Sequence, residues 1–132
     1  MVLTKKFFVV VVFVFLLSGC KDTLTNNGNK NQIVFPDSNV SYRKHVQPLF
    51  NLGCALSDCH DKQYPDRNFD LRSYSGFMYS PGIVYDSVPE NSKLIQRVEG
   101  TVLPQMPPYQ KPLNKNQQQG LRKWVAEGAQ NN

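Results

Sequence analysis

CALSDCH, residues 54–60, places two of the chain's three cysteines and one of its two histidines within seven positions. A cysteine pair whose second member is followed directly by histidine is typical of covalently attached haem, although the common spacing has two residues between the cysteines and this one has four. Each thiol can add to a vinyl group of the porphyrin, and the adjacent imidazole can reach the iron from the same side. Cys54 and Cys59 are therefore candidate thioether positions, and His60 is the candidate proximal ligand.

The N-terminus has the features of an export and lipidation signal. Two lysines precede the apolar run FFVVVVFVFLL, and the small residues Ser-Gly lead into Cys20. Eleven apolar residues are too few for a helix that spans a membrane, which needs about 20. The junction LSGC resembles the bacterial lipobox, so we expect residues 1–19 to be removed as a signal peptide and Cys20 to be acylated. Several acyl chains on one residue give stable anchoring, which predicts a chain attached to a membrane of the cell envelope, on its periplasmic side or on the outer surface.

Two other uses of the cysteines remain open. A structural zinc ion needs four ligands, and beside a lipidated Cys20 the chain offers only Cys54, Cys59, His60 and His45. The neighbouring Cys59 and His60 would then both have to bend toward one ion. A Cys54–Cys59 disulfide is credible for an exported chain, but it leaves the adjacent histidine unexplained. We expect one covalent haem c as the cofactor.

The charge pattern gives no sign of a nucleic-acid partner. Removal of residues 1–19 takes away two of the 15 basic residues and none of the 10 acidic ones, so the net charge falls from +5 to +3. Lys and Arg do not cluster along the chain, and the basic balance of the full sequence is therefore poor evidence for binding nucleic acid. We predict that no nucleic acid is bound.

Composition divides the exported chain into a tether and one domain. Residues 20–39 are rich in Asn and other polar residues, as is typical of a flexible tether. Residues 40–132 are enough for one compact domain with a thin core, which a buried apolar cofactor would thicken.

Residues 40–132 predict a mostly α domain of three to four short helices with long ordered loops. Tyr42, Val46, Leu49 and Phe50 share the apolar face of a first helix with Ser41 as its N-cap, and Pro48 inside it predicts a kink or a restart. Residues 73–79 predict a short helical turn, and a further helix is expected from Pro89 to Gly100.

The last predicted helix has the clearest boundaries. Asn114 can cap it with Gln117 in the capping-box position, and Gly128 ends it. Gly120 lies inside this helix at a cost of about 1 kcal/mol relative to alanine, which predicts close packing there against another backbone or a flat ring.

Met106 is the candidate sixth ligand of the iron. It lies in LPQMPPY, where the prolines stiffen the chain around a single thioether. Met78 and His45 are weaker candidates, because we expect Met78 to pack in the core and His45 to face solvent. The carbonyl of Pro65 could accept a hydrogen bond from the other imidazole nitrogen of His60.

The chain resembles bacterial mono-haem c-type cytochromes, specifically the small planctomycete-type cytochrome c domain on lipoproteins, in a form with four residues between the cysteines. The matching stretches are VQPLFNLGCALSDCH, NFDLRSY, PENSKLIQRVEG, MPP and LRKWVAEGAQNN, spread over residues 40–132. The resemblance implies thioethers at Cys54 and Cys59, ligation by His60 and Met106, and first and last helices that cross beside the haem. Relatives often carry a Pro-Gly turn before the PE-x-S segment, and this chain reads YDSVPENS instead, without the glycine.

These features predict an electron carrier and no enzymatic activity. A lipid-anchored mono-haem cytochrome would pass single electrons between redox protein partners of the cell envelope through small, transient contacts. Two alternatives remain. A vacant sixth position would suit a haem sensor or a peroxidase-like protein, and a disulfide-closed loop would suit a haem-free binding lipoprotein.

Overall fold

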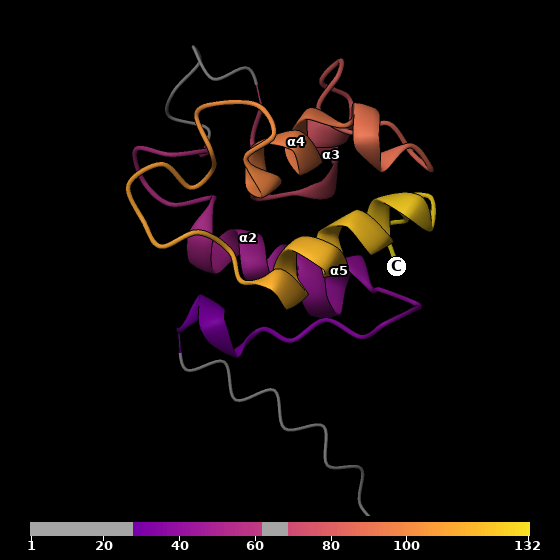
Figure 1. Ribbon diagram of the computed structural model, residues 1–132, viewed down its shortest axis with the longest axis horizontal. Helices are drawn as coiled ribbons and strands as arrows, with labels where there is room; N and C mark the ends of the chain where they lie inside the picture. Colours follow the sequence, from indigo (N-terminus) through magenta and orange to yellow (C-terminus); the bar gives the residue numbers. More distant parts are fainter. Residues whose placement is uncertain (1–27, 62–68) are drawn as a thin grey trace, which may run out of the picture.

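The computed structural model describes residues 28–61 and 69–132, and this part of the chain consists of short helices joined by long loops (Figure 1). The described ranges are helical and contain no strand, which confirms the predicted mostly α class. The elements are the 3₁₀ turn η2 (Lys30–Gln32), the π-helical turn η3 (Tyr42–Val46), α2 (Gln47–Gly53), α3 (Tyr74–Met78), the 3₁₀ turn η5 (Pro89–Asn91), α4 (Lys93–Glu99) and α5 (Lys115–Ala126).

Three of the predictions concern residues outside the described ranges. The signal peptide, the lipidated Cys20 and the Pro65 carbonyl all fall there. Of the helices that the structure describes, none is long and apolar enough to cross a membrane.

The first predicted helix restarts beside Pro48, as expected. Ser41 caps it by accepting a hydrogen bond from the Lys44 N–H, over 3.2 Å. The chain then changes from the π turn η3 to α2 at Gln47, so that Pro48 lies in the first turn of α2. Proline suits that position because the first N–H groups of a helix have no partner within the helix. The restart keeps Val46, Leu49 and Phe50 buried on one face.

The helix predicted from Pro89 to Gly100 is broken at Ser92. The chain forms η5, becomes extended at Ser92 with ψ at 117°, and starts α4 at the next residue. The Ser92 side chain is fully buried, accepts the Tyr85 N–H over 2.8 Å and lies 3.1 Å from the Val88 carbonyl. These bonds satisfy the hydroxyl locally, at the expense of a continuous helix. Gly100 ends α4 in the left-handed conformation, with φ at 77°, as predicted.

The boundaries of α5 follow from its capping box. The Gln117 N–H donates to Asn114 Oδ1 over 2.9 Å, and the Asn114 N–H donates to Gln117 Oε1 over 3.1 Å, which confirms the predicted box. The helix ends at Ala126, two residues before the expected Gly128. The short turn predicted at residues 73–79 is also confirmed, as α3 with Ser73 as its N-cap.

Trp124 of α5 lies at the centre of an aromatic core. Its ring centroid is 5.7 Å from that of Tyr42 in η3, 6.5 Å from that of Tyr74 and 6.3 Å from that of Phe77 in α3. The side chain is fully buried, and Nε1 donates to the Gln130 carbonyl over 3.0 Å. The aromatic core therefore joins the N-terminal helical segment, α3 and α5.

The segment before Val40 packs on the domain, although the tether was expected to reach Asn39. In Figure 1 this indigo segment runs along α2 and α5. Phe35 is only 3% exposed, and its N–H and C=O pair with the Asn116 side chain of α5 at 2.8 and 2.9 Å. A Cβ at Gly120 would lie 2.1 Å from Cγ of Phe35, so the glycine is packed against a flat ring, as predicted. The folded part begins close to Lys30.

Candidate functional site

The cysteine turn, residues 54–60, begins where α2 ends. Cys54 is the C-cap residue of α2, and its carbonyl accepts the N–H of His60 over 3.1 Å. Asp58 reverses the chain between them in the left-handed conformation, with φ at 68°, which aspartate tolerates better than most residues. The four residues between the cysteines therefore fold into a tight turn, and a backbone hydrogen bond joins Cys54 to His60 across it.

The two thiols of this turn are half-buried and are not joined to each other by a disulfide. Burial raises the pKa of the Cys54 thiol to about 12, while the charge of Lys30 lowers it and Cys59 raises it further. A thiol with this pKa keeps its proton at neutral pH.

His60 directly follows Cys59, and both its ring and its backbone carbonyl make contacts with the segment before α3. Its ring stacks on Phe69, with centroids 4.4 Å apart and an interplanar angle of 17°, and its Nδ1 atom is buried. Its carbonyl accepts the N–H of Leu71 over 3.0 Å, which ties the end of the cysteine turn to the segment before α3. Phe69 therefore sets the plane of the imidazole. The sequence motif predicts the histidine, but the stacking partner lies beyond the residues that the motif includes.

Met106 lies on the loop between α4 and α5, residues 101–114, which we call the methionine loop. The residue is half-buried, and its N–H donates to the Arg97 carbonyl over 2.9 Å. The Arg97 guanidinium donates to the Pro104 carbonyl over 3.1 Å, and the Gln105 side chain donates to the Val98 carbonyl over 3.1 Å. The prolines restrict the conformation of this loop, and hydrogen bonds to α4 also hold it in place.

The methionine loop presents an apolar surface. Leu103 is 77% exposed and Tyr109 is 98% exposed, and the prolines of the loop line a shallow groove of about 570 Å³. In Figure 1 the orange methionine loop and the magenta cysteine turn lie at the same end of the domain.

The two weaker sixth-ligand candidates have other contacts. Met78 packs against the core, as expected. His45 is half-buried, and the expectation that it faces solvent is wrong: its Nδ1 accepts the Ser41 N–H over 3.0 Å, and its ring lies 5.8 Å from that of Phe35. Burial lowers the pKa of His45. Within residues 28–61 and 69–132, no group of three or more His, Cys, Asp and Glu side chains is placed to hold a metal ion.

The structure thus brings Cys54, Cys59 and His60 together in one turn and places Met106 on a separate loop. Lys30, which the sequence did not indicate, connects the two regions: it lies beside the end of α2 and donates hydrogen bonds to the methionine loop. Two thiols and an imidazole stacked on Phe69 lie in the cysteine turn, and a thioether lies on the methionine loop; these are the kinds of group that hold a covalently attached haem.

Comparisons with known proteins do not add to this description, since no family model, curated protein or solved structure matches the chain.

Proposed function

We propose that the chain is a lipid-anchored mono-haem c-type cytochrome that carries single electrons between redox partners of the cell envelope. The observation that carries the proposal is the cysteine turn, in which Cys54, Cys59 and His60 meet and the imidazole plane is set by Phe69. Bound haem would supply a one-electron iron couple. The protein itself would hold the haem and set its reduction potential.

Attachment of the haem uses the chemistry of the two thiols. Each S–H group of Cys54 and Cys59 would add across one vinyl group, so that a carbon–sulfur bond forms and the thiol hydrogen passes to the neighbouring carbon. The addition is redox-neutral and requires both sulfurs in the thiol form. In the structure these two sulfurs are not joined by a disulfide, which agrees with this requirement.

The iron ligands in this proposal are His60 and Met106. His60 directly follows the second thioether position, and Met106 lies on a loop held to α4 through Arg97. A thioether ligand raises the potential of a haem iron compared with a second histidine, which suits a carrier rather than an oxygen-binding site. The half-buried, anchored position of Met106 supports this function over a sensor or peroxidase with an open sixth position.

Lipid at Cys20 would place this domain close to a membrane. Because the folded part begins near Lys30, the ten residues 20–29 connect lipid and domain. Such a segment reaches at most about 35 Å when fully extended. Electron donors and acceptors would be membrane proteins, or soluble proteins that visit the surface, and they would bind through small, transient contacts.

The decisive experiment expresses the full chain together with a cytochrome c maturation system. We expect a pyridine haemochrome spectrum and a mass increase of one haem that survives denaturation and acid-acetone extraction. The double variant Cys54→Ser/Cys59→Ser is the control and should lose both signals. Colourless protein with the mass of the lipidated polypeptide would contradict the proposal. The variant Cys20→Ser should keep the haem and lose the mass of the lipid, which tests the anchor separately.

A further inference from the structure

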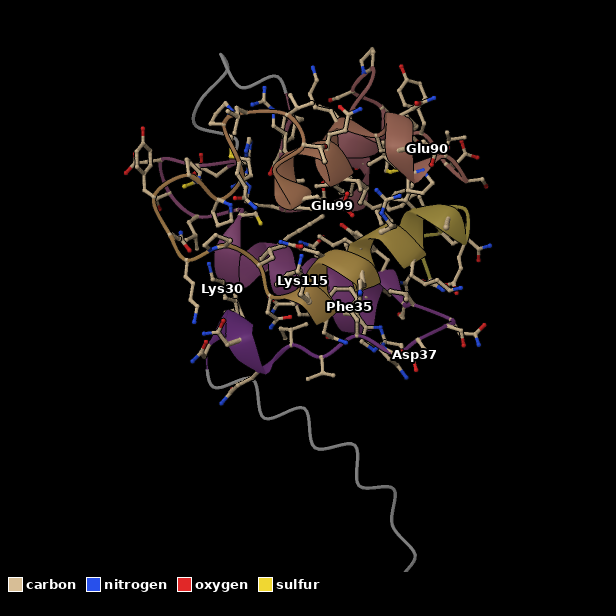
Figure 2. The ribbon with its side chains drawn as sticks, viewed as in Figure 1. Lys30, Phe35, Asp37, Glu90, Glu99 and Lys115 are labelled. Carbon is tan, nitrogen blue, oxygen red and sulfur yellow. The ribbon has the colours of Figure 1, made fainter. Side chains whose placement is uncertain are left out.

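Lys30 lies where three parts of the domain meet. Its carbonyl accepts a hydrogen bond of 2.6 Å from Nε2 of Gln117, a fully buried residue of α5. Its aliphatic stem lies against α2, since a Cβ built at Gly53 would be 3.1 Å from Cδ of Lys30. The position of Lys30 is therefore set by α5 through its backbone and by α2 through its side chain. Figure 2 labels this residue at the N-terminal segment.

The ammonium group of Lys30 reaches the methionine loop. Nζ donates to Oε1 of Gln110 over 2.9 Å and to the carbonyl of Lys111 over 3.0 Å. These two residues are about 80 positions away in sequence, and they follow Met106 within five residues. A lysine suits this task because its long stem can pack on a helix while its three donors bind acceptors beyond it.

The loop has different supports before and after Met106. Arg97 and Val98 of α4 hold the residues up to Met106, through the bonds to Met106, Pro104 and Gln105. Lys30 holds the residues that follow, at Gln110 and Lys111. The position of the sulfur relative to the cysteine turn depends on both supports, because Lys30 also contacts Gly53, the residue directly before Cys54.

We propose that Lys30 is a positioning residue, which holds the methionine loop against the end of α2 and thereby keeps Met106 in place for the iron. The inference rests on the proposed cytochrome function for its second half, the effect on ligation. Its first half, the effect on the loop, does not depend on haem.

The test uses Lys30→Met, which keeps most of the stem and removes the donors and the charge. The matched control is Lys93→Met, which removes the same charge from an exposed position in α4. The first measurement is the rate of chymotrypsin cleavage after Tyr109 in the full chain. We expect Lys30→Met to be cut about fivefold faster, the effect of losing two solvent-exposed hydrogen bonds, and the control to be cut at the wild-type rate.

The second measurement is the rate of carbon monoxide binding to the reduced haem protein, which reports release of the sixth ligand. We expect an increase of about fivefold in Lys30→Met, with no change in Lys93→Met. The variant Gln110→Leu leaves Lys30 intact and removes one of its two acceptors, so it should raise both rates by a smaller factor. This variant keeps the inference testable if Lys30→Met folds poorly.

The outcomes separate the two proposals. A wild-type chain without haem contradicts the proposed function, while the cleavage rates still test the contact of Lys30 with the loop. Equal cleavage rates in wild type and Lys30→Met overturn the inference. A faster cleavage without a change in carbon monoxide binding, in a chain that carries haem, overturns it as well, because Lys30 would then order the loop without positioning Met106.

Discussion

A single methyl group added at Gly120 should destabilise the domain, although alanine favours a helix more than glycine does. In the structure, a Cβ at this position would lie 2.1 Å from Cγ of Phe35 and 2.3 Å from Cβ and Cδ1 of the same side chain. An ordinary contact of this type is 3.4 Å or longer, so the ring or the helix has to move by more than roughly 1 Å. Neither can move easily, because Phe35 is buried and bonded to Asn116 through its backbone.

The expected loss of stability follows from two opposing effects. Overpacking of a core costs about 1–3 kcal/mol, while replacing a helical glycine by alanine contributes about 1 kcal/mol of stability. If Phe35 is expelled instead, its burial and two backbone hydrogen bonds are lost, at about 1.5–3 kcal/mol for the side chain and about 1 kcal/mol for each bond. We therefore expect Gly120→Ala to lower the free energy of unfolding by about 0–2 kcal/mol if Phe35 stays in place, and by about 2.5–4 kcal/mol if Phe35 is expelled.

Urea unfolding followed by tryptophan fluorescence measures this effect, because the chain has one tryptophan and Trp124 is fully buried. The control is Gln119→Ala at the neighbouring exposed position of α5, which should change stability by less than about 0.5 kcal/mol. In a Phe35→Gly background the whole side chain is gone, including the Cβ that lies 2.3 Å from the added methyl group, and Gly120→Ala should lose most of its cost. An increase in stability in the wild-type background would refute the packing of Phe35 on α5.

Three further variants test other contacts. Burial lowers the pKa of His45 from 6.5, so the folded state favours the neutral ring. The stability that this preference provides is present above pH 6.5 and is lost as the pH falls through the pKa of the folded state. His45→Gln should therefore flatten this part of the pH dependence of the urea midpoint. Glu127→Gln weakens the bonds of 2.9 and 2.8 Å that the carboxylate accepts from the N–H groups of Asn39 and Val40, and should cost about 1 kcal/mol in urea unfolding, whereas the exposed Glu90→Gln should not. In a chain that carries haem as proposed, Met106→Ala should make the reduced iron high-spin and open to carbon monoxide, whereas Met78→Leu should leave it unchanged.

Local sequence signals predicted the helices whose ends are determined by local contacts. The capping box of Asn114 and Gln117, the cap at Ser41 and the restart at Pro48 depend on residues close in sequence, so they could be recognised from spacing alone. The break at Ser92 could not, because its partners at Tyr85 and Val88 compete with a helix that the apolar spacing favours. The packing of residues 30–35 also escaped prediction, since a polar, Asn-rich segment has the composition of a tether.

The same distinction applies to the candidate site: a local motif predicts some of its residues, and others are brought there by contacts between distant parts of the chain. A short motif predicts Cys54, Cys59 and His60 because haem attachment needs these groups at adjacent positions, and the structure folds them into one turn. Nothing in the sequence indicates that Lys30 contacts Gln110, since that contact joins positions 80 residues apart and follows no helical or strand periodicity. Phe69 is similar, because its stacking on His60 depends on how the chain returns after the turn.

The contacts of the methionine loop bear on how an iron ligand could be supplied. The loop is bonded to Arg97 in α4 and to Lys30 beside α2, and none of these bonds involves the cysteine turn. A thioether already held near its binding position loses less conformational entropy on ligation than one on an unsupported loop. Met106→Ala should then change the spin state while chymotrypsin cleavage after Tyr109 stays at the wild-type rate, whereas Lys30→Met should raise the cleavage rate with the sulfur still present. If Met106→Ala is cut as fast as Lys30→Met, ligation to the iron is what orders the loop. The loop would then not be ordered before ligation, and the prediction would be wrong.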